Sequence, residues 1–237
     1  MPLTPDRSIL KGQQLFAGLA DEELDDVLRH ARTRRLPKDM RVFSQGDPAA
    51  TCHVLIDGRI KLTQSTPDGG QVVLRFIGPG DMYGTVAALI GIPMPADATA
   101  VVDSVEVYWS LEAMHALMQR YPRVALNSNA ITGGRLIDLQ TRIRELASER
   151  VERRIAHALL RLVRQAGRRV DEGVEIDFPI TRQDLASMTG STLHTVSRTL
   201  SAWEERGIIE GSRRHIVVRA PHRLVAIAED LPEADAP

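Results

Sequence analysis

The chain has 237 residues, enough for two domains, and its 43% hydrophobic and 26% charged residues are typical of a globular protein. A formal net charge of −1 argues against an indiscriminate binder of polyanions. The first ten residues lack the apolar core of a signal peptide, and no apolar run approaches membrane-spanning length. The single cysteine, Cys52, cannot form a disulfide within the chain. We therefore expect a cytoplasmic protein with no membrane partner.

The N-terminal half is predicted to be mostly β-structure after one short helix. Residues 21–31 begin with acidic side chains and continue with apolar residues on one face, which favours an amphipathic helix. Residues 34–110 form short β-prone runs separated by turn residues, and Asp57-Gly58 and Asp68-Gly69 are hairpin signals. Strands this short and evenly spaced predict either an antiparallel sandwich or a double-sheet jelly roll. The fold class is therefore α+β.

A second short helix is expected over residues 111–119, and a long helical segment begins near Arg123. Apolar residues recur in that segment at spacings of three, four and three, as in a coiled-coil seam: Leu136, Leu139, Ile143 and Leu146. A helix that packs only on its own domain would show a similar pattern. The narrowness of the stripe favours a homodimer seam, with a hinge expected at residues 147–150.

The C-terminal part centres on residues 181–211, which indicate two short helices joined at Gly190 and followed by a strand. Thr181 and Asp184 have the spacing of a capping box, and Ser191 or Thr192 can cap the second helix. The expected buried face of that second helix consists of Leu193, Val196, Leu200 and Trp203. Residues 151–165 precede this segment as an amphipathic helix, and residues 167–173 are expected to be a polar loop.

The opposite face of the second helix carries hydrogen-bonding groups near its N-terminus: His194, Thr195, Ser197 and Arg198. Such groups suit the reading helix of a helix-turn-helix, where an arginine can pair with a guanine. Two β-branched runs around a basic turn then predict a wing with Arg213 and Arg214 near phosphates. Helical hairpins with capped starts also occur in proteins that do not bind DNA, so the local pattern leaves both alternatives open. A short helix from Leu224 and a disordered acidic tail are expected to end the chain.

The run ITRQDLASMTGSTLHTVSRTLSAWEERGIIE closely resembles the winged helix-turn-helix of the bacterial CRP/FNR superfamily of transcription regulators. The segment TRQDLA, the turn glycine and the segment TVSR stand in the order in which their counterparts recur in that superfamily. The resemblance implies three parts: a cyclic-nucleotide-binding-like sensory β-roll over residues 1–122, a dimerisation helix with hinge over 123–150, and a winged helix-turn-helix over 151–237.

The resemblance also implies roles for individual residues on DNA. Base reading is expected from His194, Ser197 and Arg198, on a palindromic site of the TTG type, and His194 stands where the superfamily carries an acid. Contacts with the DNA backbone are expected from Thr181, Arg182, Gln183, Thr192, Thr195, Arg213 and Arg214. The implied partners are double-stranded DNA, RNA polymerase and a second copy of the chain.

The sequence argues against two of the ligands known in the superfamily. In the superfamily's cyclic-nucleotide binders a Gly-Glu and a later Arg-Ser or Arg-Thr hold the ribose and the cyclic phosphate. The matching segments here are Gly84-Thr85 and Met94-Pro95-Ala96, which contain neither the acid nor the arginine. Burying a phosphate without a cation is costly, so the sequence argues against cyclic AMP. One cysteine cannot supply the four ligands of an iron-sulfur cluster.

Haem stays open as a cofactor, because the recognition helix looks most like the branch of the superfamily that responds to nitrogen oxides. The signal would then be nitric oxide or another small ligand. The first candidate ligands are His53 and His115, with His30, Met82 and Met94 as further candidates. Each histidine is isolated, and an isolated histidine is more often structural than an axial ligand.

Catalytic motifs are absent from the sequence. It contains no G-x-S-x-G, no H-E-x-x-H, no phosphate loop and no C-x-x-C, and Gly78-Pro79-Gly80 lacks the dinucleotide fingerprint. We therefore predict that the chain is not an enzyme. The remaining alternative to a DNA-binding regulator is a cyclic-nucleotide-type module that acts on a protein partner and is not retained on duplex DNA.

Overall fold

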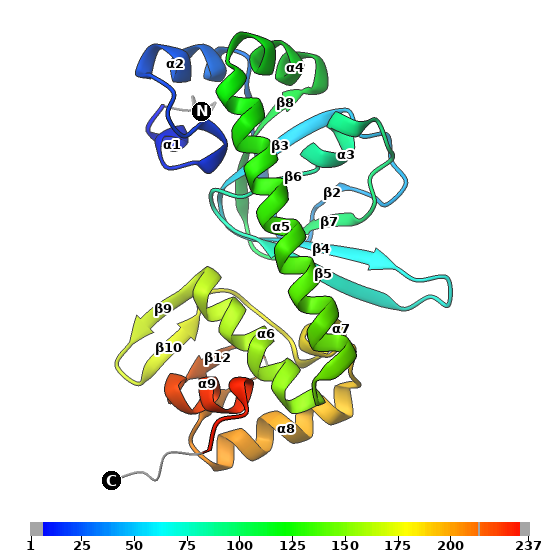
Figure 1. Cartoon of the computed structure of the whole chain (residues 1–237), viewed down its shortest axis with the longest axis vertical. Coiled ribbons are helices and arrows are strands. Elements are labelled where there is room, and N and C mark those ends of the chain that lie inside the picture. The colour runs from blue at the N-terminus through cyan, green and yellow to red at the C-terminus, as the bar shows by residue number, and fades with distance from the viewer. Residues whose placement is uncertain (1–6, 213, 233–237) are drawn as a thin grey trace. The chain divides into compact units, whose positions relative to one another are not determined.

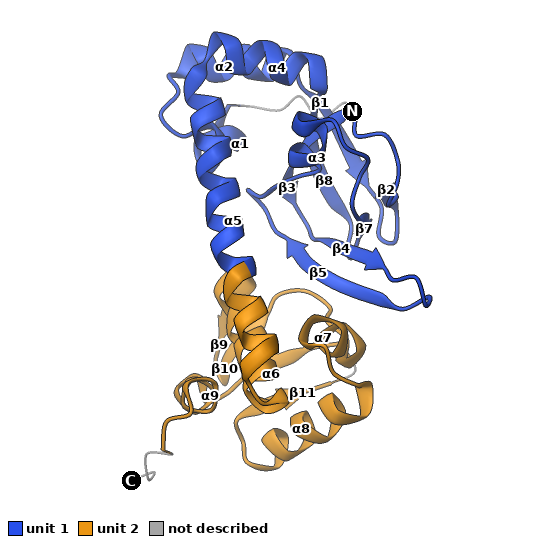
Figure 2. Cartoon of the chain, turned by 45° about the vertical axis from the view of Figure 1, so that its right-hand side comes forward, with its two compact units in different colours: residues 1–139 blue, residues 140–237 orange. Residues whose placement is uncertain are grey.

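The computed structural model describes residues 7–212 and 214–232 (Figure 1). The chain divides into two compact units, Met1–Leu139 and Gln140–Pro237, which Figure 2 colours separately. The expected acidic tail falls on residues 233–237 and one expected phosphate contact on Arg213, and both lie outside the described residues.

The first unit begins with α1 (Ser8–Lys11), the 3-10 turn η1 (Gln14–Phe16) and α2 (Asp21–Arg29). Acidic residues in the first turn of α2 favour its start, since they face the positive end of the helix dipole. The Glu23 carboxylate also accepts a hydrogen bond from the Ala20 backbone N–H at 2.7 Å. Leu24 and Val27 are buried, which confirms the predicted amphipathic helix.

Two four-stranded antiparallel sheets follow, in the orders β1-β8-β3-β6 and β2-β7-β4-β5 (Figure 1). Their strands are β1 (Arg32–Leu36), β2 (Arg41–Phe43), β3 (Thr51–Asp57), β4 (Ile60–Ser65), β5 (Gln71–Ile77), β6 (Met82–Tyr83), β7 (Asp97–Ala100) and β8 (Ser104–Ser110). The short helix α3 (Thr85–Ile90) lies between β6 and β7 in the chain, and α4 (Leu111–Arg120) follows β8. The predicted double-sheet β-roll is confirmed.

Only one of the two expected hairpin turns joins paired strands. Asp68-Gly69 connects β4 and β5, which pair antiparallel, so that prediction is confirmed. Asp57-Gly58 was wrongly interpreted as a hairpin, because it leads from β3 in one sheet to β4 in the other. Gly58 has φ +90°, and a Cβ atom there would collide with Ser104. Glycine is therefore needed here because it lets the backbone pass close to Ser104 where the chain crosses from one sheet to the other.

A buried carboxylate connects all four strands of the first sheet. Glu106 of β8 is fully buried and accepts a hydrogen bond from Arg34 Nε of β1 at 2.8 Å. Its other oxygen lies 3.1 Å from His53 Nδ1 of β3 and accepts a hydrogen bond from the Tyr83 hydroxyl of β6. Burial acts to raise the pKa of Glu106, but the hydrogen bonds from His53 and Tyr83 and the charge of Arg34 together hold it below its usual value.

The long helix α5 (Pro122–Ser148) runs without a break through Gly133 and Gly134 and through the boundary between the units. It ends where the hinge was expected, and α6 (Val151–Ala166) begins three residues later. The division at residues 122 and 150 and a bending motion there stay predictions. In the described part of the chain, no helix is long and apolar enough to span a bilayer.

In its described residues the second unit contains the end of α5, a four-stranded sheet in the order β11-β12-β10-β9 and four further helices. Besides α6, its elements are β9 (Gly167–Val170), β10 (Gly173–Ile176), α7 (Arg182–Thr189), α8 (Leu193–Glu205), β11 (Ile209–Gly211), β12 (Ile216–Val218) and α9 (Pro221–Glu229). The antiparallel pair β11-β12 confirms the two strands of the predicted wing.

Two expectations for this unit were wrong. Residues 167–173 are not a polar loop, because Gly167–Val170 pairs with β10 as a hairpin and Arg168 forms an ion pair with Glu175 across it. A polar sequence can form an edge strand when its ladder partner supplies the hydrogen bonds and opposite charges. The last helix begins at Pro221 rather than Leu224, since proline is well suited to the first turn of a helix.

The Glu106 network predicts a defined pH dependence of the first unit. Because the folded pKa of Glu106 is lowered, its stabilisation is present above the usual value of 4.5 and is lost as pH falls through the folded pKa. Glu106→Gln should make the stability of the first unit less dependent on pH in the acid range. At neutral pH the variant should lower the free energy of unfolding by about 1 to 3 kcal/mol, because it removes the counter-charge of Arg34. Urea unfolding at several pH values measures both effects, in a Trp203→Phe background that leaves Trp109 as the reporter.

The exposed Glu112 of α4 provides the matched control, since Glu112→Gln should leave the pH dependence unchanged. If Glu106→Gln unfolds with the same acid dependence as the parent, the network does not have this role.

Candidate nucleic-acid interface and sensory pocket

Capping residues position the two helices of the hairpin. Thr181 Oγ1 accepts a hydrogen bond from the Asp184 N–H at 3.0 Å, and the Asp184 carboxylate accepts one from the Thr181 N–H at 3.0 Å. Gly190 ends α7 with φ 58° and ψ 42°, a left-handed conformation that glycine adopts at little cost. Thr192 caps α8, where its Oγ1 accepts from the Thr195 N–H at 3.1 Å. The predicted start, break and restart are confirmed, with Thr192 rather than Ser191 as the cap.

The buried and exposed faces of α8 differ from the prediction at one residue. Val196, Leu200 and Trp203 are at most 1% exposed, as expected, but Leu193 is 48% exposed. The spacing of three and four residues shows which face of the helix a residue lies on. It does not show how far along the helix the rest of the domain covers that face. Leu193 is the first residue of α8, so it extends the apolar face beyond the part that is covered.

The opposite side of α8 is accessible near its N-terminus. His194 and Arg198 are exposed, and Thr195 and Ser197 are partly buried. Thr192 is also exposed at the start of the helix. This end of α8 therefore presents an imidazole, a guanidinium and several hydroxyl groups, which are the donors and acceptors that base edges require.

The expected backbone-contacting residues lie at the start of α7 and in the wing. Gln183 is exposed in the first turn of α7, and Arg214 is exposed between β11 and β12. Arg182 is partly buried and already has partners within the unit, Glu204 Oε1 at 3.1 Å and the Ser197 carbonyl at 3.4 Å. A contact between Arg182 and a phosphate would therefore replace its ion pair with Glu204.

The β-roll contains a cavity of about 170 Å³ bordered by the segments that the resemblance matched to nucleotide ligands. Gly84 and the segment Met94-Pro95-Ala96 both line it, although they are distant in sequence. Among the lining residues that sequence reasoning missed are two cations, Arg75 of β5 and Arg135 of α5. No local motif marks them, because their proximity depends on α5 packing beside the second sheet of the first unit.

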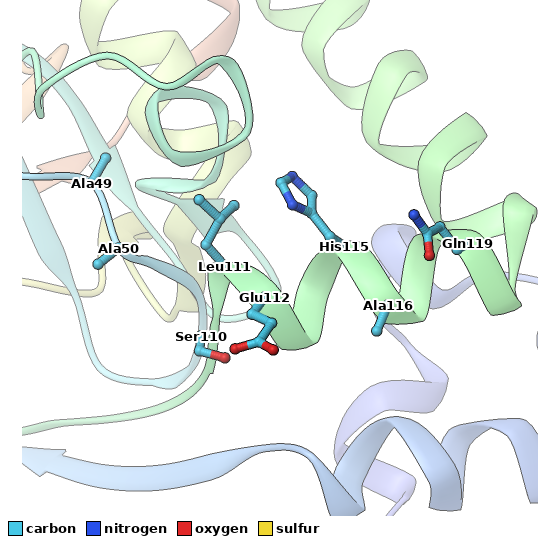
Figure 3. Close-up of a pocket in the computed structure, with 8 residues that line it drawn as sticks. All are labelled: Ala49, Ala50, Ser110, Leu111, Glu112, His115, Ala116 and Gln119. Carbon is cyan, nitrogen blue, oxygen red and sulfur yellow. The ribbon is translucent and has the colours of Figure 1, made fainter.

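The geometry does not favour the haem-ligand candidates. His53 is 3% exposed, and its ring nitrogens lie 2.8 Å from Thr51 Oγ1 and 3.1 Å from Glu106 Oε2, so both are engaged. His115 lies on the exposed side of α4 beside a shallow surface hollow, which Figure 3 shows with its lining residues. His30 is exposed, 3.8 Å from Asp26. An axial ligand needs a free nitrogen facing an apolar cavity, and these three histidines do not provide one.

The methionine candidates are no better placed for haem. Met82 and Met94 both line the cavity of about 170 Å³, which is smaller than the range of roughly 300 to 1,000 Å³ typical of ligand pockets. The described residues also contain no group of three or more His, Cys, Asp or Glu arranged to hold a metal ion.

Two family models match the chain, the Crp-like helix-turn-helix domain over residues 153–227 and the Cyclic nucleotide-binding domain over residues 33–121. The Cyclic AMP receptor protein of Thermus thermophilus is 32% identical over 219 residues, covering 92% of this chain and 98% of that protein. The Global nitrogen regulator of a Nostoc species is 25% identical and covers 85% of this chain and 94% of its own length. Among solved structures, FixK2 from Bradyrhizobium japonicum has a TM-score of 0.73 at 26% identity, covering 87% of this chain and 99% of that chain.

These similarities and the fold define a transcription regulator with a DNA-binding helix-turn-helix and a cyclic-nucleotide-binding domain. The chain belongs to the CRP/FNR superfamily of transcription regulators. Members of this superfamily are DNA-binding proteins rather than enzymes, so the prediction that the chain is not an enzyme agrees with its family. The helix-turn-helix also argues against the alternative of a module that acts only on a protein partner.

The left-handed turn between α7 and α8 predicts a sharp difference between two substitutions. Gly190→Ala should destabilise the second unit by about 1 to 2 kcal/mol, because a residue with a Cβ atom is strained at φ 58°. Gly190→Asn should cost less, since asparagine tolerates this conformation. Urea unfolding followed by Trp203 fluorescence in a Trp109→Phe background measures both.

Both variants share the contact of a new Cβ atom with Leu146, 3.2 Å away, so their difference isolates the backbone strain. Equal losses of stability would show that crowding, rather than the backbone conformation, makes Gly190 necessary.

Proposed function

We propose that the chain is a homodimeric, cytoplasmic, sequence-specific regulator that binds a two-fold symmetric DNA site of the TTG type. A small ligand sensed by the β-roll, either nitric oxide or another small molecule, controls this binding, and RNA polymerase is the protein partner. The observation that carries the proposal is the accessible side of α8, where His194 and Arg198 are exposed while Val196, Leu200 and Trp203 are buried behind them.

In this proposal three side chains of α8 read bases in the major groove. Arg198 donates to the two acceptors of a guanine, and Ser197 lies near a thymine. His194 stands where the superfamily carries an acid, and a neutral histidine can either donate or accept, whereas a carboxylate only accepts. We therefore expect looser specificity at the base pair next to that guanine.

The proposed contacts with the DNA backbone position these reading groups on the duplex. They come from Thr181, Arg182, Gln183, Thr192, Thr195, Arg213 and Arg214. Arg182 differs from the others, because it must break its ion pair with Glu204 before it can contact a phosphate. Contacts of this kind fix the register of the protein on DNA without reading sequence.

The exposed apolar stripe of α5 supports the proposed homodimer. Its members are 49 to 65% exposed in the single chain: Leu136, Leu139, Ile143 and Leu146. Apolar residues at these spacings are covered when two such helices pack as a coiled coil, which removes the cost of leaving them in water. Two copies related by a two-fold axis would also explain a palindromic site.

For the β-roll we propose a class of ligand, a small molecule, and not a particular compound. Proteins with a cyclic-nucleotide-binding domain bind small ligands, and one relative is named a cyclic AMP receptor protein. In this chain Gly84 and the segment Met94-Pro95-Ala96 line the cavity, and the matching segments lack the acid and the arginine that hold a cyclic nucleotide. We therefore do not extend cyclic AMP to this chain.

The proposed seam predicts that one charge will separate the subunits. Ile143→Asp places a carboxylate in the apolar interface and should yield monomers with greatly weakened operator binding. The control is Ile90→Asp on α3, because Ile90 is 63% exposed against 65% for Ile143 but lies outside the seam. Light scattering of the full chain gives the mass, and an intact dimer of the Ile143 variant would refute the seam.

The proposed reading residues predict a change in sequence preference. Arg198→Ala should cost about 1 to 3 kcal/mol on the preferred site and flatten discrimination at the contacted G·C pair. His194→Glu should shift preference at the adjoining position, because the carboxylate only accepts hydrogen bonds. Selection from a random duplex pool measures both effects, with Arg164→Ala, an exposed arginine on α6 outside the hairpin, as the control.

Two outcomes of the selection would overturn this assignment. One is a wild-type site without two-fold symmetry, and the other is an Arg198→Ala variant with an unchanged preference at the G·C pair.

A further inference from the structure

Two arginines form a wall between the apolar cavity of the β-roll and a polar cleft outside it. Arg75 and Arg135 line the cavity of about 170 Å³, and both also line the outer cleft of about 490 Å³. Asp81 and Asp138 are the acidic residues that line the cleft, and neither lines the cavity. These two arginines are therefore the lining residues that the cavity and the cleft share.

The carboxylates near this wall do not balance the two arginines equally. Arg75 forms an ion pair with Asp81 at 3.1 Å. Arg135 donates a hydrogen bond to the Met82 carbonyl, which carries no charge. Burial lowers the pKa of Arg135 to about 10, and the charge of Arg75 adds to this effect while Asp81 opposes it. Asp138 is exposed, one helical turn along α5 from Arg135. The partly buried Arg135 cation thus lies near a second cation, Arg75. An anion bound between them would reduce the electrostatic repulsion.

The interior of the cavity suits an aromatic ring. Phe43 and Tyr83 contribute aromatic rings to its lining, and Met82 and Met94 contribute thioethers, which adapt well to aromatic ligands. An engineered apolar cavity of about 150 Å³ takes up benzene, so the available space matches one ring. Pockets for larger ligands typically measure roughly 300 to 1,000 Å³.

We infer that this cavity binds a small aromatic monocarboxylate, with its ring among Phe43, Tyr83 and the methionines and its carboxylate on Arg135 and Arg75. The inference names the ligand class of the sensory β-roll and so rests on the proposed function. A planar guanidinium matches a carboxylate through two parallel hydrogen bonds, which gives both affinity and orientation. The ring is enclosed, and the charged end faces the polar cleft.

Calorimetric titration of the full chain with benzoate tests the inference, with benzamide as a neutral probe of nearly the same shape. We expect saturable binding of one benzoate per chain and at least about tenfold weaker binding of benzamide, because it lacks the charge. Equal affinities for the two compounds, or no saturable binding of benzoate at millimolar concentrations, would overturn it. Displacement of benzoate by cyclic AMP would also overturn it, in favour of a nucleotide site.

Three variants separate the charge from the cavity. Arg135→Gln should weaken benzoate at least about tenfold and leave benzamide unchanged. Ala87→Leu should weaken both probes, because Ala87 is 4% exposed and lines the cavity. Arg41→Gln on β2 should change neither, since the exposed Arg41 lines neither hollow. Unchanged benzoate binding in both the Arg135 and the Ala87 variants would refute the site.

Retention of the same preparations on duplex DNA, measured with and without benzoate, distinguishes this inference from the proposed function. Loss of DNA binding under both conditions with intact benzoate binding would contradict the regulator and leave the ligand site standing. Sequence-specific DNA binding without benzoate uptake would contradict the ligand site alone.

Discussion

Burial of one face of α8 is the constraint on which the DNA-binding unit depends. Val196, Leu200 and Trp203 are almost completely buried, and burying a large apolar side chain contributes about 1.5 to 3 kcal/mol. Turning the helix about its axis would expose these three and force Arg198 toward the core, where an unpaired charge is costly. Packing therefore decides which side of α8 remains accessible. The caps at Thr181 and Thr192 only set where α7 and α8 begin.

The first unit contains a structural cluster of charged residues and a separate pair of arginines that lines its cavity. Glu106 engages one residue from each of the other strands of its sheet, so that cluster fixes the sheet and leaves His53 without a free ring nitrogen. Arg135 differs because its one hydrogen-bond partner among the described contacts is a carbonyl and its guanidinium borders an apolar cavity. The ligand site that we infer therefore rests on a charge that is incompletely balanced at a cavity wall.

Local sequence signals were reliable where one short segment decides the structure. The cap at Thr181 and the hairpin turn at residues 68–69 were correctly predicted, because the hydrogen bonds and φ angles involved are local. Residues 57–58 have the same turn chemistry but join two sheets, and a dipeptide does not reveal which strands pair. The edge strand at residues 167–170 depends on its ladder partner, and the role inferred for Arg135 depends on tertiary packing. The residues proposed to contact DNA and to pair two chains stay predictions.

In the proposed complex, two chains place their α8 helices in successive turns of the major groove. The most direct measurement combines hydroxyl-radical footprinting on a selected duplex with the mass of the protein–DNA complex. We expect two chains per duplex and two protected regions whose centres lie about 10 base pairs apart, one helical turn of DNA. A complex of one chain per duplex, or a single protected region, would contradict the account.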